Sequence, residues 1–161
     1  MAERRNERTL VILKPDAVAR RLVGEIVGRL ERKGLVIRAL KMITITREMA
    51  ERQYAPHKGK DFYEPLVRFM TASPSVLMVV EGVEAIGVVR KLMGATFGPD
   101  AEPGTVRGDL GMSRRFNLAH GSDGPESAAR EIGIFFRPDE MLETPEPDRG
   151  WVYDLTGPEP V

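Results

Sequence analysis

The chain has 161 residues, of which 42% are hydrophobic and 30% are charged, as is typical of one globular domain that can bury a core. Its 24 Lys and Arg residues balance its 24 Asp and Glu residues, so net charge gives no reason to expect binding to nucleic acid or to an anionic membrane. The absence of cysteine excludes disulfides, iron–sulfur clusters and thiol catalysis, and two histidines without cysteine argue against an all-protein zinc site.

The two ends of the chain differ from its middle. The N-terminus MAERRNERT is basic but has no apolar segment of the kind found in a secretory signal, and the longest apolar runs are too short to span a bilayer. We therefore expect a cytoplasmic protein with one domain over residues 1–161. In this domain residues 1–8 are frayed, and residues 137–161 form a tail rich in proline and acid.

The first three elements are expected to be a strand, a helix and a strand. TLVILK, at 9–14, is a continuous apolar run, which is typical of a strand buried on both faces. Apolar residues at helical spacing follow between Leu22 and Leu30, and Gly34 is placed to end that helix. LVIRALKMITI, at 35–45, predicts a long strand in which polar residues interrupt the apolar ones.

The middle of the chain alternates further helices with one strand. The pattern predicts helices over 46–55 and 61–72, a buried strand over 76–82 and a helix over 83–94. Thr46 and Asp61 are placed to cap the first two of these helices. The stretch 95–116 is rich in Gly and Pro, and long irregular loops of this kind are uncommon unless they are functional or disordered.

The C-terminal part predicts one more helix and one more strand. The helix begins near Gly124, with Asp123 as its cap and Glu126 closing a capping box, and IGIFF, at 132–136, predicts the last strand. With the inserted helices set aside, the order is βαββαβ. This order predicts an α+β fold: a ferredoxin-like antiparallel sheet covered by helices on one face, with added helices and an inserted loop.

His120 is the first candidate for chemistry. It lies among small and polar residues, one short turn before the expected helix N-terminus, where free N–H groups and a partial positive charge favour bound anions. An imidazole at such a position is favoured in its neutral, nucleophilic form. From spacing alone, an ordinary surface histidine in a Gly/Ser loop is the favoured interpretation of His120.

Several other side chains could form a phosphate or base site, although each alone is better explained by a structural or surface role. Lys14 ends the first strand, and lysines and arginines bind phosphate oxygens, so Arg90 and Arg107 join it as candidates. Phe62 could stack on a base or pack in the core. His57 is interpreted as an exposed turn residue. The sequence contains neither a P-loop nor a G-x-G-x-x-G motif.

Taken together, these residues resemble a known family. From about Thr9 to Tyr153 the chain resembles nucleoside diphosphate kinases. NLAHGSDGPES resembles the family's active-site segment N-x-x-H-G-S-D-x-x-x-S, and LVILKPDAVARRLVGEI resembles its first strand and helix. EPGTVRGD resembles the loop that carries a phosphate-binding arginine. Three long motifs in the same order make this resemblance far more specific than any single residue.

The resemblance implies a role for each matching position. It implies that His120 is the nucleophile, that Glu131 orients its imidazole, that Tyr54 lies beside it and that Ser122 assists near the leaving phosphate. It further implies that Phe62 stacks on the base and Leu66 lines the same slot. Phosphate and ribose contacts would come from Lys14, Arg90, Thr96, Arg107 and Asn117. Mg²⁺ would arrive on the nucleotide phosphates, with no metal ligand from the protein.

The resemblance also implies an activity and an assembly. The activity is reversible transfer of the γ-phosphate from a nucleoside triphosphate to a nucleoside diphosphate, by a ping-pong mechanism through phosphohistidine, with broad tolerance of base and sugar. The tail WVYD resembles longer members that form hexamers, so a hexamer is favoured over the tetramer of some shorter relatives. Gly98 departs from the proline of many relatives, and the last residues, TGPEPV, have no assigned role.

Two other classes of protein stay open at this point. A non-catalytic nucleotide-binding or signalling module could use the same fold, because fold does not fix function. The presence of His120, Lys14, Arg107 and Asn117 together favours the enzyme. An RNA-binding domain could also use a ferredoxin-like sheet, but the chain lacks the aromatic strand motif of such domains and has no net positive charge.

Overall fold

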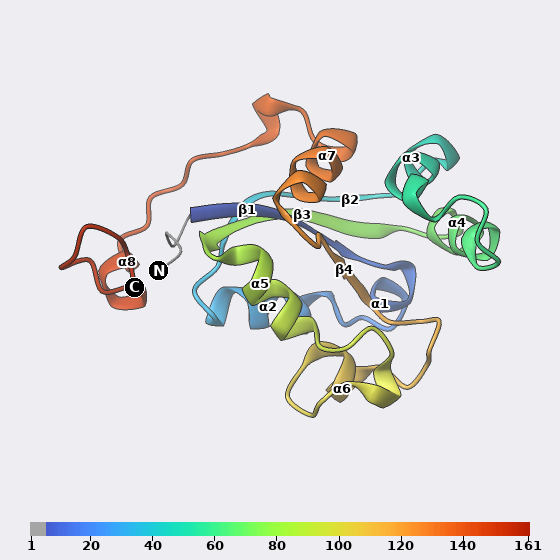
Figure 1. Cartoon of the computed structure of the whole chain (residues 1–161), viewed down its shortest axis with the longest axis horizontal. Coiled ribbons are helices and arrows are strands. Elements are labelled where there is room, and N and C mark those ends of the chain that lie inside the picture. The colour runs from blue at the N-terminus through green and yellow to red at the C-terminus, as the bar shows by residue number, and fades with distance from the viewer. Residues whose placement is uncertain (1–5) are drawn as a thin grey trace.

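The computed structural model describes residues 6–161 and has the α+β architecture expected from the sequence (Figure 1). Its centre is a four-stranded sheet with the order β2-β3-β1-β4, in which every neighbouring pair is antiparallel. This is the strand order of the ferredoxin-like fold. The strands are β1 (Asn6–Leu13), β2 (Val36–Ile43), β3 (Ser75–Val83) and β4 (Ala119–Gly121).

Helices cover both faces of this sheet, and the expectation of one covered face was wrong. Side chains alternate along β1, so Leu10 and Ile12 enter one apolar core while Val11 and Leu13 enter the other. The second core is completed by α1 (Pro15–Ala19), α2 (Val23–Arg32) and α5 (Ala85–Met93). The first is completed by α3 (Arg47–Gln53), α4 (Tyr63–Thr71) and α7 (Pro125–Phe135), and Figure 1 shows α7 and α5 on opposite sides of the strands. The continuous apolar run of β1 is explained by this double burial.

The fourth strand is not where the sequence pattern placed it. Residues 132–136 do not form a strand: all but the last of them belong to α7, and the strand that completes the sheet is β4. The buried residues of α7 are Ala128, Glu131, Ile134 and Phe135, and they are spaced as one face of a helix. The sequence pattern hides this spacing because Glu131 is polar. A short apolar run alone cannot separate a strand from a buried helix segment. The correction places the candidate nucleophile His120 in the sheet itself.

The expected helix caps were correct in one case of three. Thr46 caps α3 and accepts a hydrogen bond from the Met49 N–H at 3.2 Å. Asp61 does not cap α4, which begins after Phe62. Asp123 does not cap α7 either: the cap position is Gly124, and Asp123 instead accepts a hydrogen bond from the Ser127 hydroxyl.

The loop between α5 and β4 contains two short helical turns, η2 (Gly98–Asp100) and α6 (Val106–Leu110). Thr105 caps α6 by accepting a hydrogen bond from the Gly108 N–H at 3.0 Å. At Gly98 an added Cβ would lie 2.2 Å from the Gly111 carbonyl oxygen. The two backbone segments therefore approach so closely that position 98 has no room for a side chain, proline included.

The start of β1 and the C-terminal tail lie close together, and Arg8 pairs with Glu143 of the tail. Residues 6–8, which were expected to be frayed, form the start of β1, whereas residues 1–5 of that expected segment lie outside the described residues. The C-terminal tail runs past them through the turn η3 (Pro138–Glu140) to the short helix α8 (Arg149–Val152). None of the helices within residues 6–161 has the length and apolar composition needed to cross a bilayer.

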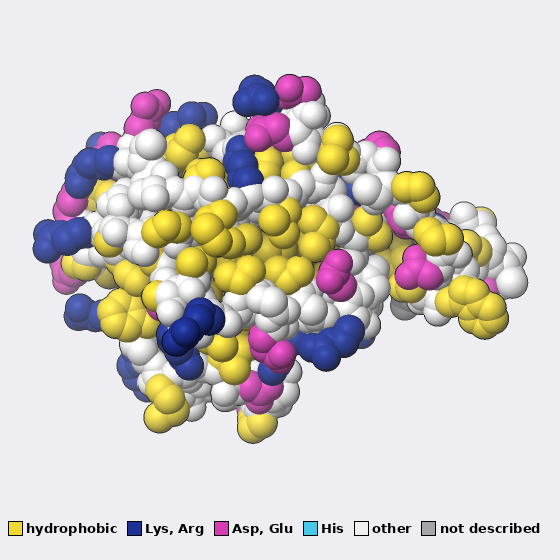
Figure 2. Space-filling view, turned by 180° about the vertical axis from the view of Figure 1, so that it is seen from behind, with side chains coloured by type: hydrophobic (Ala, Val, Ile, Leu, Met, Phe, Trp, Pro, Cys, Tyr) yellow, Lys and Arg dark blue, Asp and Glu magenta, His cyan; other side chains and the backbone are white. Residues whose placement is uncertain are grey.

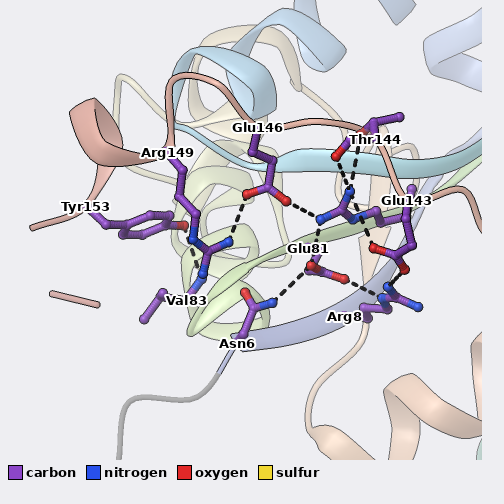
Figure 3. Close-up of polar contacts among 10 residues, drawn as sticks. Asn6, Arg8, Glu81, Val83, Glu143, Thr144, Glu146, Arg149 and Tyr153 are labelled. Carbon is purple, nitrogen blue, oxygen red and sulfur yellow. Dashed lines mark hydrogen bonds and ion pairs between the residues drawn. The ribbon is translucent and has the colours of Figure 1, made fainter. Parts of the chain in front are cut away.

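A network of ion pairs attaches this tail to the sheet (Figure 3). Arg38 on β2, only 4% exposed, donates to Glu81 on β3 at 2.9 Å and to Glu146 of the tail. Arg8 on β1 also pairs with Glu81. Burial alone would raise the pKa of the Glu81 carboxyl, but the hydrogen bonds from Arg38, Arg8 and Asn6 prevail and lower it to about 2.

Glu81→Gln is expected to destabilise the protein in a pH-dependent way. A pKa that falls from 4.5 in the unfolded chain to about 2 corresponds to about 3 kcal/mol of unfolding free energy. Because the folded pKa is depressed, this stability is present above pH 4.5 and is lost as the pH falls toward 2. Urea unfolding of wild type and variant at several pH values measures the difference, which should shrink across that window.

Glu143→Gln is the matched control, since Glu143 also pairs with Arg8 but its side chain is 69% exposed. Exposed pairs contribute less than about 1 kcal/mol, so this variant should remain close to wild type at all pH values. Equal losses in both variants would contradict the assignment of the stability to the buried carboxylate.

Candidate active site

The sheet positions His120 for chemistry. His120 lies in β4, paired with Ile12 of β1, and its half-buried imidazole points to α7. There its Nε2 lies 2.8 Å from Oε2 of Glu131. Within residues 6–161 the imidazole makes its hydrogen bonds through Nε2, which leaves Nδ1 available to a substrate.

The carboxylate of Glu131 is held in its ionised form. Burial would raise the pKa of Glu131, but hydrogen bonds from His120, Ser122 and Gln53 outweigh burial and lower it. The Ser122 hydroxyl donates to the same Oε2 at 2.7 Å. An ionised carboxylate can only accept, so it fixes the imidazole proton on Nε2 of His120 and the lone pair on Nδ1.

A buried lysine and an amide lie beside the histidine. Lys14, directly after β1, donates from Nζ to Oδ1 of Asn117 at 2.7 Å, and Nδ2 of Asn117 donates to the Thr96 carbonyl at 3.0 Å. Burial, and after it the charge of Arg107, lowers the pKa of Lys14 to about 8. The ammonium group is thus short of anionic partners, and a phosphate would supply one.

Arg107 is fixed by backbone carbonyl groups. Its guanidinium donates to the carbonyls of Asn117 at 3.0 Å, Gly94 at 3.0 Å and Ala119 at 2.6 Å. These contacts leave part of its five-donor fork for a ligand. Burial, followed by the charge of the exposed Arg90, lowers the pKa of Arg107 to about 10. The cation is preorganised, because no ligand is needed to hold it in place.

One strained residue sets the relative placement of these groups. Leu118, fully buried, adopts a left-handed backbone with φ +70°, which is rare for a non-glycine residue. The segment after β1 holds it on both sides: Lys14 N–H donates to its carbonyl at 2.8 Å, and its own N–H donates to Oδ2 of Asp16 at 3.0 Å. The turn at Leu118 brings Asn117 and His120 to the same end of β1.

Aromatic side chains extend from the histidine toward α4. Tyr54, buried and with its pKa raised by burial and by the charge of Glu131, presents its edge to the His120 ring at 6.4 Å between centroids. His57, expected to be an exposed turn residue, is half-buried and lies 6.5 Å from Tyr54 and 5.3 Å from Phe62. Phe62 itself is 49% exposed, and Leu66 follows one turn later on α4.

The structure thus brings together most of the residues singled out from the sequence. One group consists of the His120 imidazole with Glu131, Ser122 and Tyr54 around it. In the second group, hydrogen bonds connect Asn117 to Lys14, to Arg107 and to the Thr96 backbone. Among the described residues, no hydrogen bond joins Phe62, Leu66 or Arg90 to these groups. Phe62 contacts His57, and the charge of Arg90 acts on Arg107. Sequence reasoning missed Gln53 and Asp16. Gln53 contacts His120, and Asp16 accepts a hydrogen bond from the Leu118 N–H. Both contacts join residues far apart in the chain, and no local sequence motif indicates them.

Comparison with known proteins agrees with this geometry. The family model of nucleoside diphosphate kinase matches residues 7–141. A nucleoside diphosphate kinase of Thermococcus kodakarensis is 56% identical over 89% of this chain and 84% of its own, and that of Archaeoglobus fulgidus is 54% identical over 92% and 98%.

Two solved structures extend the comparison to three dimensions. The enzyme of Halobacterium salinarum in complex with CDP has a TM-score of 0.91 and 46% identity, over 93% of this chain and all of its own. The enzyme of Borrelia burgdorferi, a transition-state mimic with vanadate and ADP, has a TM-score of 0.83 and 38% identity, over 89% and 94%.

The fold and the site define a nucleotide-binding phosphotransferase. A carboxylate-oriented histidine beside preorganised cations is suited to transferring phosphate, and the ferredoxin-like sheet presents both at one edge. The chain belongs to the nucleoside diphosphate kinase family. It is a kinase of nucleotides, as its relatives are.

The low pKa of Lys14 predicts how nucleotide binding depends on pH. Above about pH 8 the free enzyme loses the Lys14 charge, so the KM for a nucleoside diphosphate should rise with pH in that range. Lys14→Arg keeps the charge and should show a flatter KM profile, whereas Lys14→Ala should reduce turnover by roughly 10²–10³, the effect of losing one preorganised donor. Steady-state kinetics from neutral to alkaline pH measure both effects. An identical KM profile in wild type and Lys14→Arg would contradict this role.

Proposed function

We propose that the enzyme works by a ping-pong mechanism through phosphohistidine at His120. Nδ1 attacks the γ-phosphorus of a nucleoside triphosphate, the N–P bond forms, and the bond to the β-phosphate oxygen breaks to release the diphosphate. A second diphosphate then attacks the phosphohistidine with a terminal oxygen, and the N–P bond breaks. The observation that carries this proposal is the contact of Nε2 with Glu131, which leaves Nδ1 as the nucleophile.

The cations and amides are assigned to the phosphates and the sugar. Lys14, Arg107 and Asn117 are held in place before any substrate arrives, so they stabilise the charge of the phosphoryl group in transfer at little reorganisation cost. Arg90 and Thr96, both exposed, are proposed to make the remaining contacts with the phosphates and the sugar. Ser122 is proposed to act near the leaving oxygen. The vanadate and ADP complex of the Borrelia burgdorferi relative supports phosphoryl transfer in this type of site.

Mg²⁺ is the cofactor we propose, carried by the nucleotide phosphates. Within residues 6–161, no group of three or more His, Asp and Glu side chains is arranged to hold a metal ion. The groups beside His120 are an ammonium, a guanidinium and an amide, which suit phosphate oxygens better than a cation. When bound, the metal neutralises part of the phosphate charge.

Phe62 and Leu66 are proposed to bind the base by stacking and apolar contact. The exposed Phe62 ring stands at the start of α4 with Leu66 on the next turn. Stacking tolerates every base, because every base has a π-face. Relatives have been solved with CDP and with ADP, one pyrimidine and one purine nucleotide, which supports broad base tolerance here. Tolerance of the sugar is part of the same proposal.

A homo-oligomer in the cytoplasm is the proposed working state, with a hexamer favoured over a tetramer. Hydrophobic side chains gather across the middle of one face of the molecule (Figure 2), and Trp151 of the tail is 93% exposed in the single chain. Apolar surface of this kind is typical of an interface between proteins. Tyr153, by contrast, accepts a hydrogen bond from the Val83 N–H at 3.1 Å on its own chain. Light scattering of the purified protein distinguishes the two assemblies.

His120→Ala is expected to abolish the phosphoenzyme while the protein remains folded. After incubation with γ-labelled ATP, wild type should carry a label that survives base and is lost in acid, as phosphohistidine does. The chain has one other histidine, so His57→Ala is the matched control and should still be labelled. A label retained in His120→Ala, or a stable label in acid, would contradict the mechanism; a wild type that binds nucleotide but takes no label would point to a non-catalytic module.

The stacking model predicts narrow differences among bases. The kcat/KM values for ADP, GDP, CDP, UDP and dTDP should fall within roughly two orders of magnitude of one another, the scale of differences in stacking. Phe62→Ala should lower all of them, and purines most, because larger rings lose more contact. A gap of about 10⁴ or more between two bases, the scale of hydrogen-bonded base recognition, would overturn the model.

A further inference from the structure

A strained turn lies directly before His120. The Ala119 N–H donates back to the Asn117 carbonyl at 2.8 Å, and this hydrogen bond between residues two positions apart closes a γ-turn around Leu118. The positive φ of Leu118, +70°, is that of the classic γ-turn, the rare and strained form. A leucine keeps such a left-handed backbone only where its surroundings hold it there. The groups that contact Leu118 therefore determine the path of the chain into β4.

The side chain of Asp16 takes part in holding this turn. Its Oδ2, in the first turn of α1, accepts the hydrogen bond of the Leu118 N–H at 3.0 Å, and within residues 6–161 this N–H has no other acceptor. On the opposite side, the Leu118 carbonyl accepts from the backbone N–H of Lys14 at 2.8 Å. Leu118 is fully buried, and an unpaired buried N–H is costly. The left-handed conformation therefore depends on the Asp16 carboxylate.

The residues on both sides of the turn belong to the candidate active site. Before it, Asn117 accepts from Lys14 Nζ at 2.7 Å through its side chain and from Arg107 Nε at 3.0 Å through its carbonyl. After it, the chain enters β4 and reaches His120. A change of φ at Leu118 rotates these two flanking segments relative to one another. The turn thus sets the position of the imidazole relative to the two cations.

The charge of Asp16 does not suit a direct role in binding nucleotide. The carboxylate lies close enough to Lys14 for its charge to act on that ammonium group. A negative charge beside a phosphate site repels the phosphates. The second oxygen, Oδ1, is buried and has no hydrogen-bond partner among the described residues. The contact with the Leu118 N–H is therefore the contact that explains a carboxylate at this position.

We infer that Asp16 is a positioning residue for phosphotransfer: its carboxylate holds the γ-turn at Leu118 and thereby places the His120 imidazole opposite the phosphate bound by Lys14 and Arg107. The inference rests on the proposed phosphohistidine mechanism. Asp16 acts through the backbone of the turn and does not touch the substrate. Its loss is therefore expected to affect the transfer step more than the binding of nucleotide.

The first test is Asp16→Ala, which removes the acceptor. Single-turnover labelling with γ-labelled ATP measures the rate of phosphoenzyme formation, which should fall by roughly 10²-fold, the effect that a misplacement of about 1 Å can have. The Kd for ADP, measured by calorimetry, should stay close to wild type, because Lys14 and Arg107 keep their charges and Phe62 is unchanged. A melting scan measures the loss of stability separately. A role in stability alone would leave the labelling rate of the folded enzyme unchanged.

Two further substitutions separate the geometry of the carboxylate from its charge. Asp16→Asn keeps an acceptor oxygen at the same distance from the backbone and removes the charge, so it should label at a rate close to wild type. Asp16→Glu keeps the charge but moves the oxygens by one methylene group, so its rate should fall toward that of Asp16→Ala. Both are compared at about pH 6.5, well below the pKa of about 8 of Lys14, so that this ammonium group stays charged. If Asp16→Ala does not fold, this pair carries the test.

Glu7→Ala is the matched control. Glu7 lies at the other end of β1 and is also half-buried, and its Oε2 accepts from the Ile86 N–H at 3.1 Å, two residues after the left-handed Glu84. The variant removes the same type of contact between a carboxylate and a backbone N–H, but away from His120. It should lower the melting temperature and leave the labelling rate unchanged. An equal loss of labelling rate in Glu7→Ala and Asp16→Ala would overturn the inference.

Amide hydrogen exchange reports on the turn directly. In Asp16→Ala the Leu118 N–H should exchange faster than in wild type, whereas in Asp16→Asn it should stay protected. An unchanged labelling rate in Asp16→Ala, or an active Asp16→Glu beside an inactive Asp16→Asn, would contradict the role of Asp16 in the turn. A wild type that forms no phosphohistidine would overturn the mechanism itself and, with it, this inference.

Discussion

The short pairing of β4 with β1 is the constraint on which the site depends. Only three residues of β4 join the sheet, and they do so beside the last residues of β1. This pairing sets His120 against Ile12, and the strained Leu118, bound by Lys14 and Asp16, fixes the chain just before it. Residues more than a hundred positions apart thus meet at one sheet end, and the left-handed strain is stored where the chemistry takes place.

The orientation of the proposed nucleophile and the placement of the cations have separate supports. On one face of the sheet, the imidazole contacts Glu131 of α7 and Gln53 of α3. The guanidinium of Arg107 is held by the backbone carbonyls of Gly94, of Asn117 and of Ala119 in β4. Because these supports are formed without substrate, the site is organised before the nucleotide binds, as electrostatic catalysis requires.

Much of the fold could be predicted from the sequence, and the errors have physical reasons. Apolar periodicity identified three of the four strands, but the fourth is three residues long with a histidine at its centre, so it has no apolar pattern to detect. The run 132–136 was wrongly predicted as a strand because the buried face of its helix includes a polar residue, Glu131. Glu131 is buried and hydrogen-bonded, so it does not add to the apolar pattern by which a helix is recognised. Most candidate site residues came from motif resemblance, whereas Gln53 depends on tertiary proximity between α3 and β4, which no local pattern records.

The tail extends the fold beyond the part that the family model matches. The family model ends at residue 141, yet Glu146 lies beyond it and pairs with Arg38, a guanidinium buried inside the matched region. Arg38 also pairs with Glu81 on β3, so Glu146 is the second of two carboxylates that meet this guanidinium. Positions 38 and 146 are therefore expected to change together among relatives, and where the tail is shortened Glu81 is left as the remaining partner of an arginine at position 38.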